Sequence, residues 1–189
     1  NSSNAVTNQW QTLEISTAGV VDWSTETFGE AKLHEADLNQ DLDGDGNIWS
    51  QNSEVLTAVS SDTKGALAYL DSSKNLFIAS GAGQTKNAVL DFSGGLISFD
   101  ETYSLGNFTD KREVLAVESA TVGGTDYYKV LIKNTTSSAS ESTTAYETVN
   151  IKQSTMIVDW GTFSYYVDPK KLESAFQIDI DGDGTITTI

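Results

Sequence analysis

One short acidic motif occurs twice in this chain. Residues 41–48 read DLDGDGNI and residues 179–186 read DIDGDGTI. Each copy places three aspartates at alternate positions and a glycine directly after the third, which is the order of an EF-hand-type calcium loop. Carboxylates this close repel one another unless a cation neutralises them. The pattern therefore favours two calcium sites over the alternative of two polar Asp-Gly turns.

The predicted calcium ligands occupy positions 1, 3, 5 and 7 of each loop, and position 7 contributes its backbone carbonyl. They are Asp41, Asp43, Asp45 and Asn47 in the first copy, and Asp179, Asp181, Asp183 and Thr185 in the second. An EF-hand also has a bidentate glutamate at position 12. That position is Asn52 in the first copy and lies beyond residue 189 in the second. We therefore expect no paired EF-hand domain, but shorter loops that take further ligands from elsewhere or from water.

A glutamate stands six residues before each acidic loop. Glu35 precedes Asp41, and Glu173 precedes Asp179. Both glutamates lie in segments whose residue pattern is typical of short helices. Each is either an acid on the helix surface or an additional calcium ligand, and the sequence leaves both interpretations open.

Helices are expected directly before both loops. The first spans residues 29–39 and the second spans residues 168–177, where Asp168 suits the N-cap and Pro169 suits the first turn. The expected inward-facing residues are Leu33, Ala36 and Leu38 in the first helix, and Leu172, Ala175 and Phe176 in the second. A short helix leading into an Asp-rich loop is thus predicted twice.

Short β-like runs fill most of the remaining chain, and turn-rich pieces separate them. The expected strands are residues 10–15, 19–23, 66–70, 75–79, 87–92, 95–99, 114–118, 126–132, 147–151 and 157–160. Strands at this spacing are typical of an antiparallel sandwich or barrel. We therefore predict a mainly β fold, sandwich or barrel-like, with short helices that each lead into an EF-hand-like calcium loop.

The end of the chain repeats its beginning after about 137 residues, as repeat proteins do. ETVNI at 147–151 parallels QTLEI at 11–15, and IVDW at 157–160 parallels VVDW at 20–23.

This repetition predicts three parts. Residues 1–52 are the C-terminal half of a repeat unit ending in a calcium loop, residues 53–64 are a connector, and residues 65–189 are a complete unit ending in the second loop. Within the complete unit, the low-complexity residues 134–144 are either a mobile hairpin loop or a linker.

The charge balance restricts the partners. The formal net charge of −16 argues against nucleic acid and against anionic membrane surfaces. The chain has no cysteine, so bound metal is the expected substitute for disulfides as a source of stability. No apolar run approaches the length of a transmembrane helix.

The helix and acidic loop resemble the tryptophan-rich repeat domain of secreted calcium-binding proteins, haemolysin-type or adhesin-like, from cyanobacteria and marine bacteria. The matching residues of the second copy are Glu173, Phe176, Asp179, Asp181, Gly182, Asp183, Gly184 and Ile186, with 114–119 and 127–134 upstream. Those of the first copy are Glu35, Leu38, Asp41, Asp43, Gly44, Asp45, Gly46 and Ile48. The resemblance covers most of residues 65–189 and 10–49. It implies an extracellular module that carries out no reaction.

We therefore expect a calcium-binding structural or adhesive module of a larger secreted or cell-surface bacterial repeat protein, folded or rigidified by calcium. Its expected partners are calcium ions, neighbouring repeats, and a cell-surface glycan or protein. The alternative is a calcium-stabilised carbohydrate-binding module that uses exposed Trp and Tyr, foremost Trp49 and Trp160, as a stacking platform. We favour the other interpretation of these aromatics, in which they alternate into the core. The chain carries no catalytic motif, so we expect no enzyme.

Overall fold

The computed structural model of the chain describes residues 9–17, 19–30, 34–40, 42, 55–59 and 65–188. Two short helices are present there, α1 (Glu35–Leu38) and α2 (Lys170–Phe176). The strands are β1 (Gln9–Ile15), β2 (Val21–Glu30), β3 (Thr57–Ala58), β4 (Leu67–Leu70), β5 (Leu76–Ala79), β6 (Asn87–Ala88), β7 (Thr102–Leu105), β8 (Phe108–Val122), β9 (Thr125–Ser137), β10 (Ser142–Lys152) and β11 (Val158–Tyr166).

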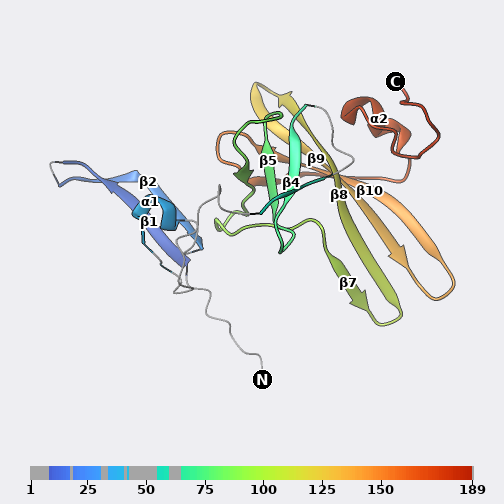
Figure 1. Cartoon of the computed structure of the whole chain (residues 1–189), viewed down its shortest axis with the longest axis horizontal. Coiled ribbons are helices and arrows are strands. Elements are labelled where there is room, and N and C mark those ends of the chain that lie inside the picture. Colours follow the sequence, from blue (N-terminus) through green and yellow to red (C-terminus); the bar gives the residue numbers. More distant parts are fainter. Residues whose placement is uncertain are drawn as a thin grey trace.

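These strands form three antiparallel sheets (Figure 1). The largest sheet has the order β11-β10-β9-β8-β7, the second has the order β3-β4-β5-β6, and β1 pairs with β2. The prediction of a mainly β, antiparallel fold is therefore confirmed. None of the helices among these residues is long and apolar enough to cross a membrane.

The long strands of the five-stranded sheet follow from alternating side chains and a tight turn. Gly123 and Gly124 link β8 to β9 with φ of 58° and 82°, a conformation that glycine adopts at low cost and that two-residue hairpins favour. Along β9, Val130 and Ile132 face one side of the sheet, and Leu131 faces the other.

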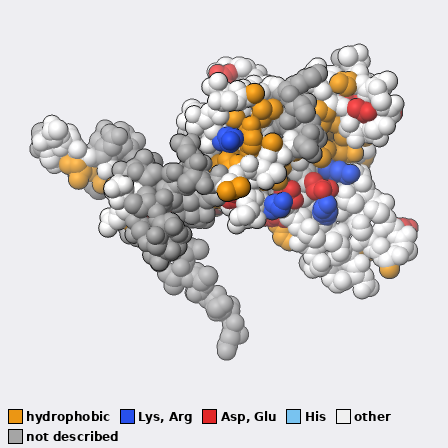
Figure 2. Space-filling view, viewed as in Figure 1, with side chains coloured by type: hydrophobic (Ala, Val, Ile, Leu, Met, Phe, Trp, Pro, Cys, Tyr) orange, Lys and Arg blue, Asp and Glu red, His pale blue; other side chains and the backbone are white. Residues whose placement is uncertain are grey.

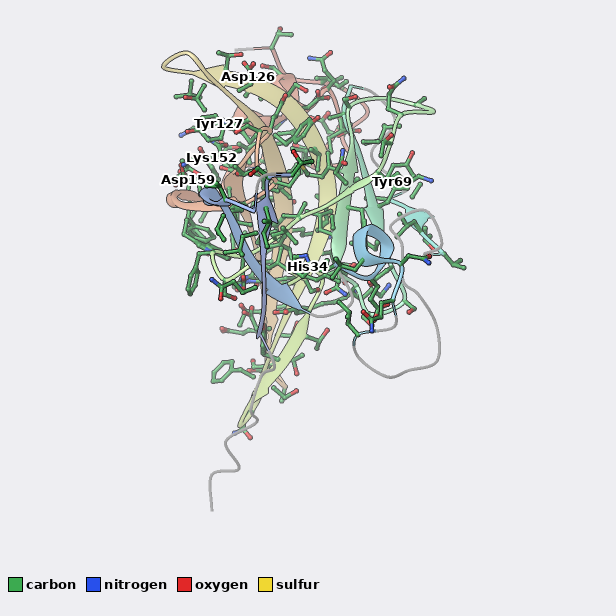
Figure 3. All side chains as sticks on the ribbon, turned by 90° about the vertical axis from the view of Figure 1, so that its left-hand side faces the viewer. His34, Tyr69, Asp126, Tyr127, Lys152 and Asp159 are labelled. Carbon is green, nitrogen blue, oxygen red and sulfur yellow. The ribbon has the colours of Figure 1, made fainter. Side chains whose placement is uncertain are left out.

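The larger hydrophobic core lies between the five-stranded and four-stranded sheets. Leu76 and Ile78 of β5 belong to the same buried cluster as Val130 of β9 and Val149 of β10. The two sheets therefore share one buried core. In Figure 3, Tyr69 of β4 and Asp159 of β11 lie on opposite sides of the view.

A smaller core lies on the other face of the five-stranded sheet, beneath α2. Leu172 and Phe176 of the helix are buried against Ala116, Leu131 and Tyr146. The spacing of Leu172 and Phe176 puts both side chains on one face of the helix. This packing fixes α2, and with it the start of the second acidic loop, against the sheet.

The repeated hairpins have the same strand register. In β1–β2 the partners are Thr12 with Thr27, Glu14 with Asp22 and Ile15 with Val21. In β10–β11 the partners are Thr148 with Ser164, Asn150 with Asp159 and Ile151 with Val158. An irregularity falls between Thr12 and Glu14 in the first hairpin, and between Thr148 and Asn150 in the second. The repetition seen in the sequence is therefore also a repetition of backbone pairing.

The low-complexity segment 134–144 forms a hairpin, as one of its two interpretations held, but most of it is strand and only its middle is loop. Its first residues extend β9 to Ser137, its last residues begin β10 at Ser142, and Thr136 pairs with Thr143. Residues 138–141 alone form the turn, closed by a backbone bond of 2.7 Å from Ser138 N–H to the carbonyl of Glu141. Serine and threonine fit an exposed strand end because their hydroxyls pair across strands.

The first predicted helix is mostly wrong. Gly29 and Glu30 belong to β2, and the α-helix is limited to Glu35–Leu38. Leu38, expected to face inward, is 53% exposed, whereas Glu35 is buried. Leu33 lies outside the described residues. The backbone pairing of β2 with β1 decided the structure here against helix propensity.

Two smaller expectations also differ from the structure, and the segment between the two predicted parts contains a strand. Residues 95–99 form isolated bridges at Leu96 and Ser98 and belong to none of the named strands. Ala175, expected in the apolar stripe of α2, is exposed. Within the segment 53–64, interpreted as a connector, Thr57–Ala58 forms β3 and pairs with β4.

Candidate metal centre

The second acidic loop begins where α2 ends. The helix cap is Pro169 and not Asp168 as expected, although Asp168 Oδ1 receives the backbone N–H of Lys170 at 3.1 Å. The helix stops at Gln177, which takes a left-handed conformation with φ of 55°. This reversal turns the chain back so that Asp179 to Thr187 pass beside the helix.

Glu173 joins the helix to the loop. Its side chain is fully buried. Its Oε1 receives the backbone N–H of Ile180 at 3.1 Å and that of Asp181 at 3.4 Å, and its Oε2 receives that of Thr187 at 2.9 Å. The bond from Thr187 lowers the pKa of the Glu173 carboxyl by more than burial raises it. The carboxylate therefore stays ionised and holds both ends of the loop.

The carboxylates of the three loop aspartates accept hydrogen bonds from backbone N–H groups of the same loop. Asp179 Oδ1 receives Gly182 N–H and Asp179 Oδ2 receives Gly184 N–H, both at 2.8 Å. Asp181 Oδ1 receives Asp183 N–H at 3.1 Å. Gly182 and Gly184 have φ of 77° and 87°, so the alternate glycines are needed for the backbone path.

Asp183 completes this arrangement. Its Oδ1 receives the backbone N–H of Thr185 at 2.9 Å and the hydroxyl of Thr185 at 2.6 Å. Its Oδ2 lies 2.7 Å from the ammonium of Lys170, and that ammonium is 3.4 Å from Asp181 Oδ2. The hydrogen bond from Lys170 lowers the pKa of Asp183 to about 2. The same two carboxylates raise the pKa of Lys170.

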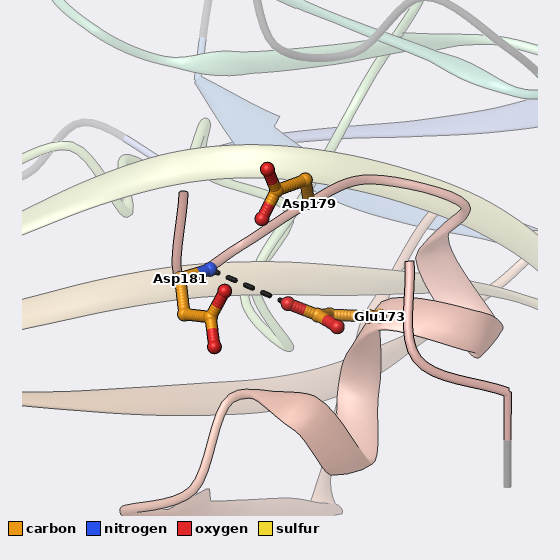
Figure 4. Close-up of side chains that lie close together, drawn as sticks. All are labelled: Glu173, Asp179 and Asp181. Carbon is orange, nitrogen blue, oxygen red and sulfur yellow. Dashed lines mark hydrogen bonds between the residues drawn. The ribbon is translucent and has the colours of Figure 1, made fainter. Parts of the chain in front are cut away.

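The carboxylates of Glu173, Asp179 and Asp181 approach closely enough to share a metal ion (Figure 4). One oxygen from each lies within 4.8 Å of the others. All of these donors are oxygens, and oxygen donors select hard cations such as Ca²⁺ and Mg²⁺. The residues present therefore fit such an ion chemically. Glu173 and Asp179 each accept backbone N–H groups with both carboxylate oxygens. Glu173 is also fully buried, whereas Asp179 and Asp181 are exposed, so Glu173 fits less well as a ligand.

The burial of both glutamates rules out their interpretation as helix-surface acids. Glu35 and Glu173 are 1% and 0% exposed. An isolated carboxylate is costly to bury, and the sequence alone could not reveal that the following loop would return to supply N–H donors. The hint was the identical spacing of the glutamate and the loop in both copies.

The described part of the first copy shows the same contact. Glu35 Oε1 receives the backbone N–H of Leu42 at 2.9 Å, as Glu173 Oε1 receives that of Ile180. Asn39, like Gln177, has a left-handed conformation, with φ of 51°. The predicted ligands Asp41, Asp43, Asp45 and Asn47 and the predicted platform residue Trp49 lie outside the described residues.

Sequence reasoning missed the role of Lys170. A lysine three residues before the glutamate occurs in both copies, as Lys32 and as Lys170. That shared position was a signal, although the distance to the carboxylates appears only when the loop folds back. The structure thus brings Glu173, Asp179, Asp181 and Asp183 together with one cationic side chain.

The second predicted platform residue, Trp160, is half-exposed. It is 47% exposed, and its ring centroid lies 5.8 Å from that of Phe99. Phe163 and Tyr165 on the same strand are 42% and 60% exposed. Tyr128 is buried in the larger core. The aromatics are therefore divided between the core and the surface.

Comparison of the chain with protein-family models, with curated proteins and with solved structures found no match.

Proposed function

We propose that the loop from Asp179 to Thr185 binds calcium and that the chain is a calcium-stabilised structural module. The observation that carries the proposal is the way the loop is built. Each aspartate uses oxygen atoms to hold the loop backbone. Oxygens of Asp179, Asp181 and Glu173 lie within 4.8 Å of one another, and Asp181 and Asp183 share the ammonium of Lys170.

The proposed ligands are the carboxylates of Asp179, Asp181 and Asp183 and the backbone carbonyl of Thr185. Water completes the coordination, because Ca²⁺ takes six to eight oxygens. Glu173 acts from behind the loop by holding its N–H groups. Ca²⁺ is favoured over Mg²⁺ because Mg²⁺ demands near-ideal octahedral geometry. The bound ion would neutralise the repulsion among the three carboxylates.

The corresponding loop of the first copy is proposed to bind a second ion. Its ligands would be Asp41, Asp43, Asp45 and Asn47. The support is the shared order of aspartates and glycines in the two motifs, together with the equivalent contact of Glu35 with Leu42. Each short helix with its loop would then form one calcium-binding element.

The module would belong to a larger secreted or cell-surface repeat protein, in which its role is structural or adhesive. The internal repetition and the resemblance to tryptophan-rich repeat domains support this role, which involves no catalysis. Extracellular modules bind calcium with Kd of about 10⁻⁴–10⁻³ M. At about 100 times Kd, one site adds about 2.7 kcal/mol to the free energy of unfolding.

The test is a thermal melt in excess calcium, in magnesium and in EDTA. We expect calcium to raise the Tm by about 5–10 °C per site at saturation. Asp181→Asn keeps the Oδ1 acceptor for Asp183 N–H but removes a charge, so it should reduce the shift. Asp126→Asn is the matched control, because Asp126 accepts the Thr121 hydroxyl in a hairpin away from the loop. Identical melts in all three buffers would contradict the proposal.

A glycan-binding surface is a second candidate function, favoured by the exposed aromatics of β11. Trp160, Phe163 and Tyr165 are all exposed. Tyr165 pairs across strands with Glu147. Directly paired residues lie on the same face of the sheet. Aromatic rings of this kind stack on sugars while their polar groups stay in contact with solvent.

A buried carboxylate, that of Glu147, lies opposite Tyr165 in the sheet. Glu147 Oε1 receives a hydrogen bond from Asn134 at 3.0 Å and one from Arg112 at 3.3 Å. Figure 2 shows acidic and basic side chains gathered together on this view of the protein. Glu147 is only 3% exposed, so the exposed rings, and not this carboxylate, are the candidate sugar contacts.

A glycan array with the intact chain tests this second function. Tyr165→Ala should lower binding to any glycan retained by the unchanged chain. Phe92→Ala is the matched control, because Phe92 is 84% exposed but lies in the turn after β6. The absence of any bound glycan, or an equal loss in both variants, would argue against it.

A further inference from the structure

The ammonium of Lys170 lies close to two loop carboxylates, those of Asp181 and Asp183. Its Nζ lies 2.7 Å from Asp183 Oδ2 and 3.4 Å from Asp181 Oδ2. The Oδ1 atoms of the same two aspartates accept backbone N–H groups. Lys170 therefore takes the oxygens of Asp181 and Asp183 that do not hold the loop backbone.

The position of Lys170 in the helix makes this contact more informative. Lys170 is the first residue of α2. A positive charge is unfavourable at a helix N-terminus, where the backbone dipole is itself positive. Helix stability therefore does not explain a lysine here, whereas neutralisation of the acidic loop does.

The first copy has a lysine at the same position. Lys32 stands three residues before Glu35, as Lys170 stands three residues before Glu173. The neighbouring lysine is not repeated, because the residue equivalent to Lys171 is Leu33. Lys32 lies outside the described residues, so this agreement concerns the sequence alone.

We propose that Lys170 is a built-in counter-ion of the acidic loop and that a divalent cation binds there by displacing its ammonium. This inference rests on the proposed calcium site. Without calcium, the lysine offsets part of the repulsion between Asp181 and Asp183 and keeps the loop folded. With calcium, the ammonium leaves the carboxylates for solvent, and the loop exchanges one cation for the other.

The exchange sets the calcium concentration at which the loop responds. Calcium has to compete with a tethered positive charge, so the affinity is lower than the carboxylates alone would give. A unit charge about 5 Å from a divalent ion in a water-like dielectric changes the binding constant by about tenfold. Removal of the Lys170 charge should therefore tighten calcium binding about tenfold at low ionic strength, and less at high salt.

Calorimetric calcium titrations of the whole chain test this prediction. The background carries Asp43→Asn and Asp45→Asn, so that heat from the second loop is measured alone. We compare Lys170→Met, which removes the charge, with Lys170→Arg, which keeps it. Lys171→Met is the matched control, because Lys171 is exposed and forms no ion pair among the described residues.

A second measurement needs no variant. The side-chain ammonium of Lys170 is observed by ¹⁵N NMR in the unmodified chain, first in EDTA and then in saturating calcium. A hydrogen-bonded ammonium exchanges its protons slowly and gives a signal, whereas one released to solvent exchanges quickly. We expect the Lys170 signal in EDTA and its loss or shift in calcium.

The outcomes separate the two proposals. The counter-ion proposal is supported if Lys170→Met binds calcium more tightly, while Lys170→Arg and Lys171→Met bind it with an affinity near that of the background chain. If all variants bind calcium with equal affinity, or if the Lys170 signal does not change when calcium is added, the counter-ion proposal is wrong and the calcium-site proposal still stands. No calcium binding by any chain overturns the calcium site and, with it, the exchange.

Discussion

The two copies of the hairpin and acidic loop share their local contacts but differ in how their helices pack. Both hairpins have the same strand register. In both copies a buried glutamate, Glu35 or Glu173, accepts the backbone N–H seven residues later. These contacts lie within a short stretch of chain, so the repeated motif is enough to form them.

The helices differ because their surroundings differ. In the second copy, Leu172 and Phe176 are buried against residues of the five-stranded sheet. The equivalent residues of the first copy are His34 and Leu38, and Leu38 is 53% exposed. Among the described residues, the first hairpin is a sheet of two strands. The hydrogen bond from the glutamate to the loop is therefore present in both copies, whereas Leu38 of the first copy is not packed as its equivalent Phe176 is.

This comparison separates two sources of order at the candidate metal centre. The buried glutamate organises the start of the loop through its hydrogen bonds. The larger sheet holds the helix through buried apolar area, which lengthens α2 to seven residues against four in α1. Variants at equivalent positions can measure each source by itself.

The largest expected difference concerns the apolar anchors. Leu172→Ala should lower the free energy of unfolding by about 2–5 kcal/mol, because it leaves a cavity beneath α2. Leu38→Ala should change it by less than about 0.5 kcal/mol, because the side chain is exposed. Urea unfolding of both variants measures the two changes. Similar losses would mean that the first helix is packed as firmly as the second.

The next largest effect concerns the buried glutamates. Glu173→Gln replaces an oxygen acceptor by an amide donor that faces backbone N–H groups, so we expect the Tm to fall by about 5–10 °C. Glu35→Gln should lower the Tm less, because Leu38, the equivalent of the buried Phe176, is exposed. Both variants should weaken calcium binding at their own loops. Thermal melts and calcium titrations check these expectations, and an unchanged Tm in Glu173→Gln would refute the role of that carboxylate.

The smallest effect is a pH dependence in the second loop. The pKa of Asp183 falls from 3.8 to about 2 because of the hydrogen bond from Lys170. A lowered pKa means that the stabilisation is complete above pH 3.8 and is lost as the pH falls toward 2. Melts in EDTA should show the unchanged chain more stable than Asp183→Asn at pH 5. The difference should shrink toward pH 2, and a constant difference would contradict the ion pair.

The sequence predicted the strands best where alternation and turn residues agreed. The runs at 66–70, 75–79, 114–118 and 126–132 all lie in or overlap named strands. The loop predicted over residues 134–144 was too long because serine and threonine are common in both loops and exposed strands. The pairing partner decided between them, since β9 and β10 run antiparallel to their ends.

Part of the candidate site was also readable in advance. The alternate aspartates and glycines of the second loop specify its turns, and the carboxylates of Asp179 and Asp181 lie close together beside that of Glu173. The burial of Glu173 was not readable, because it depends on where Thr187 returns. The contact of Lys170 with Asp183 joins residues thirteen apart, and helix periodicity cannot predict such a contact.

The sequence by itself determined the internal repetition, the mainly β character and the spacing of glutamate and aspartates, because these follow from short-range alternation and turn chemistry. Only the tertiary structure decided that Leu172 would be buried while Leu38 is exposed, that Glu173 would hold the loop from behind, and that Lys170 would face its carboxylates. Burial and charge pairing depend on which surfaces meet, and a chain's neighbours along the sequence do not specify its neighbours in space.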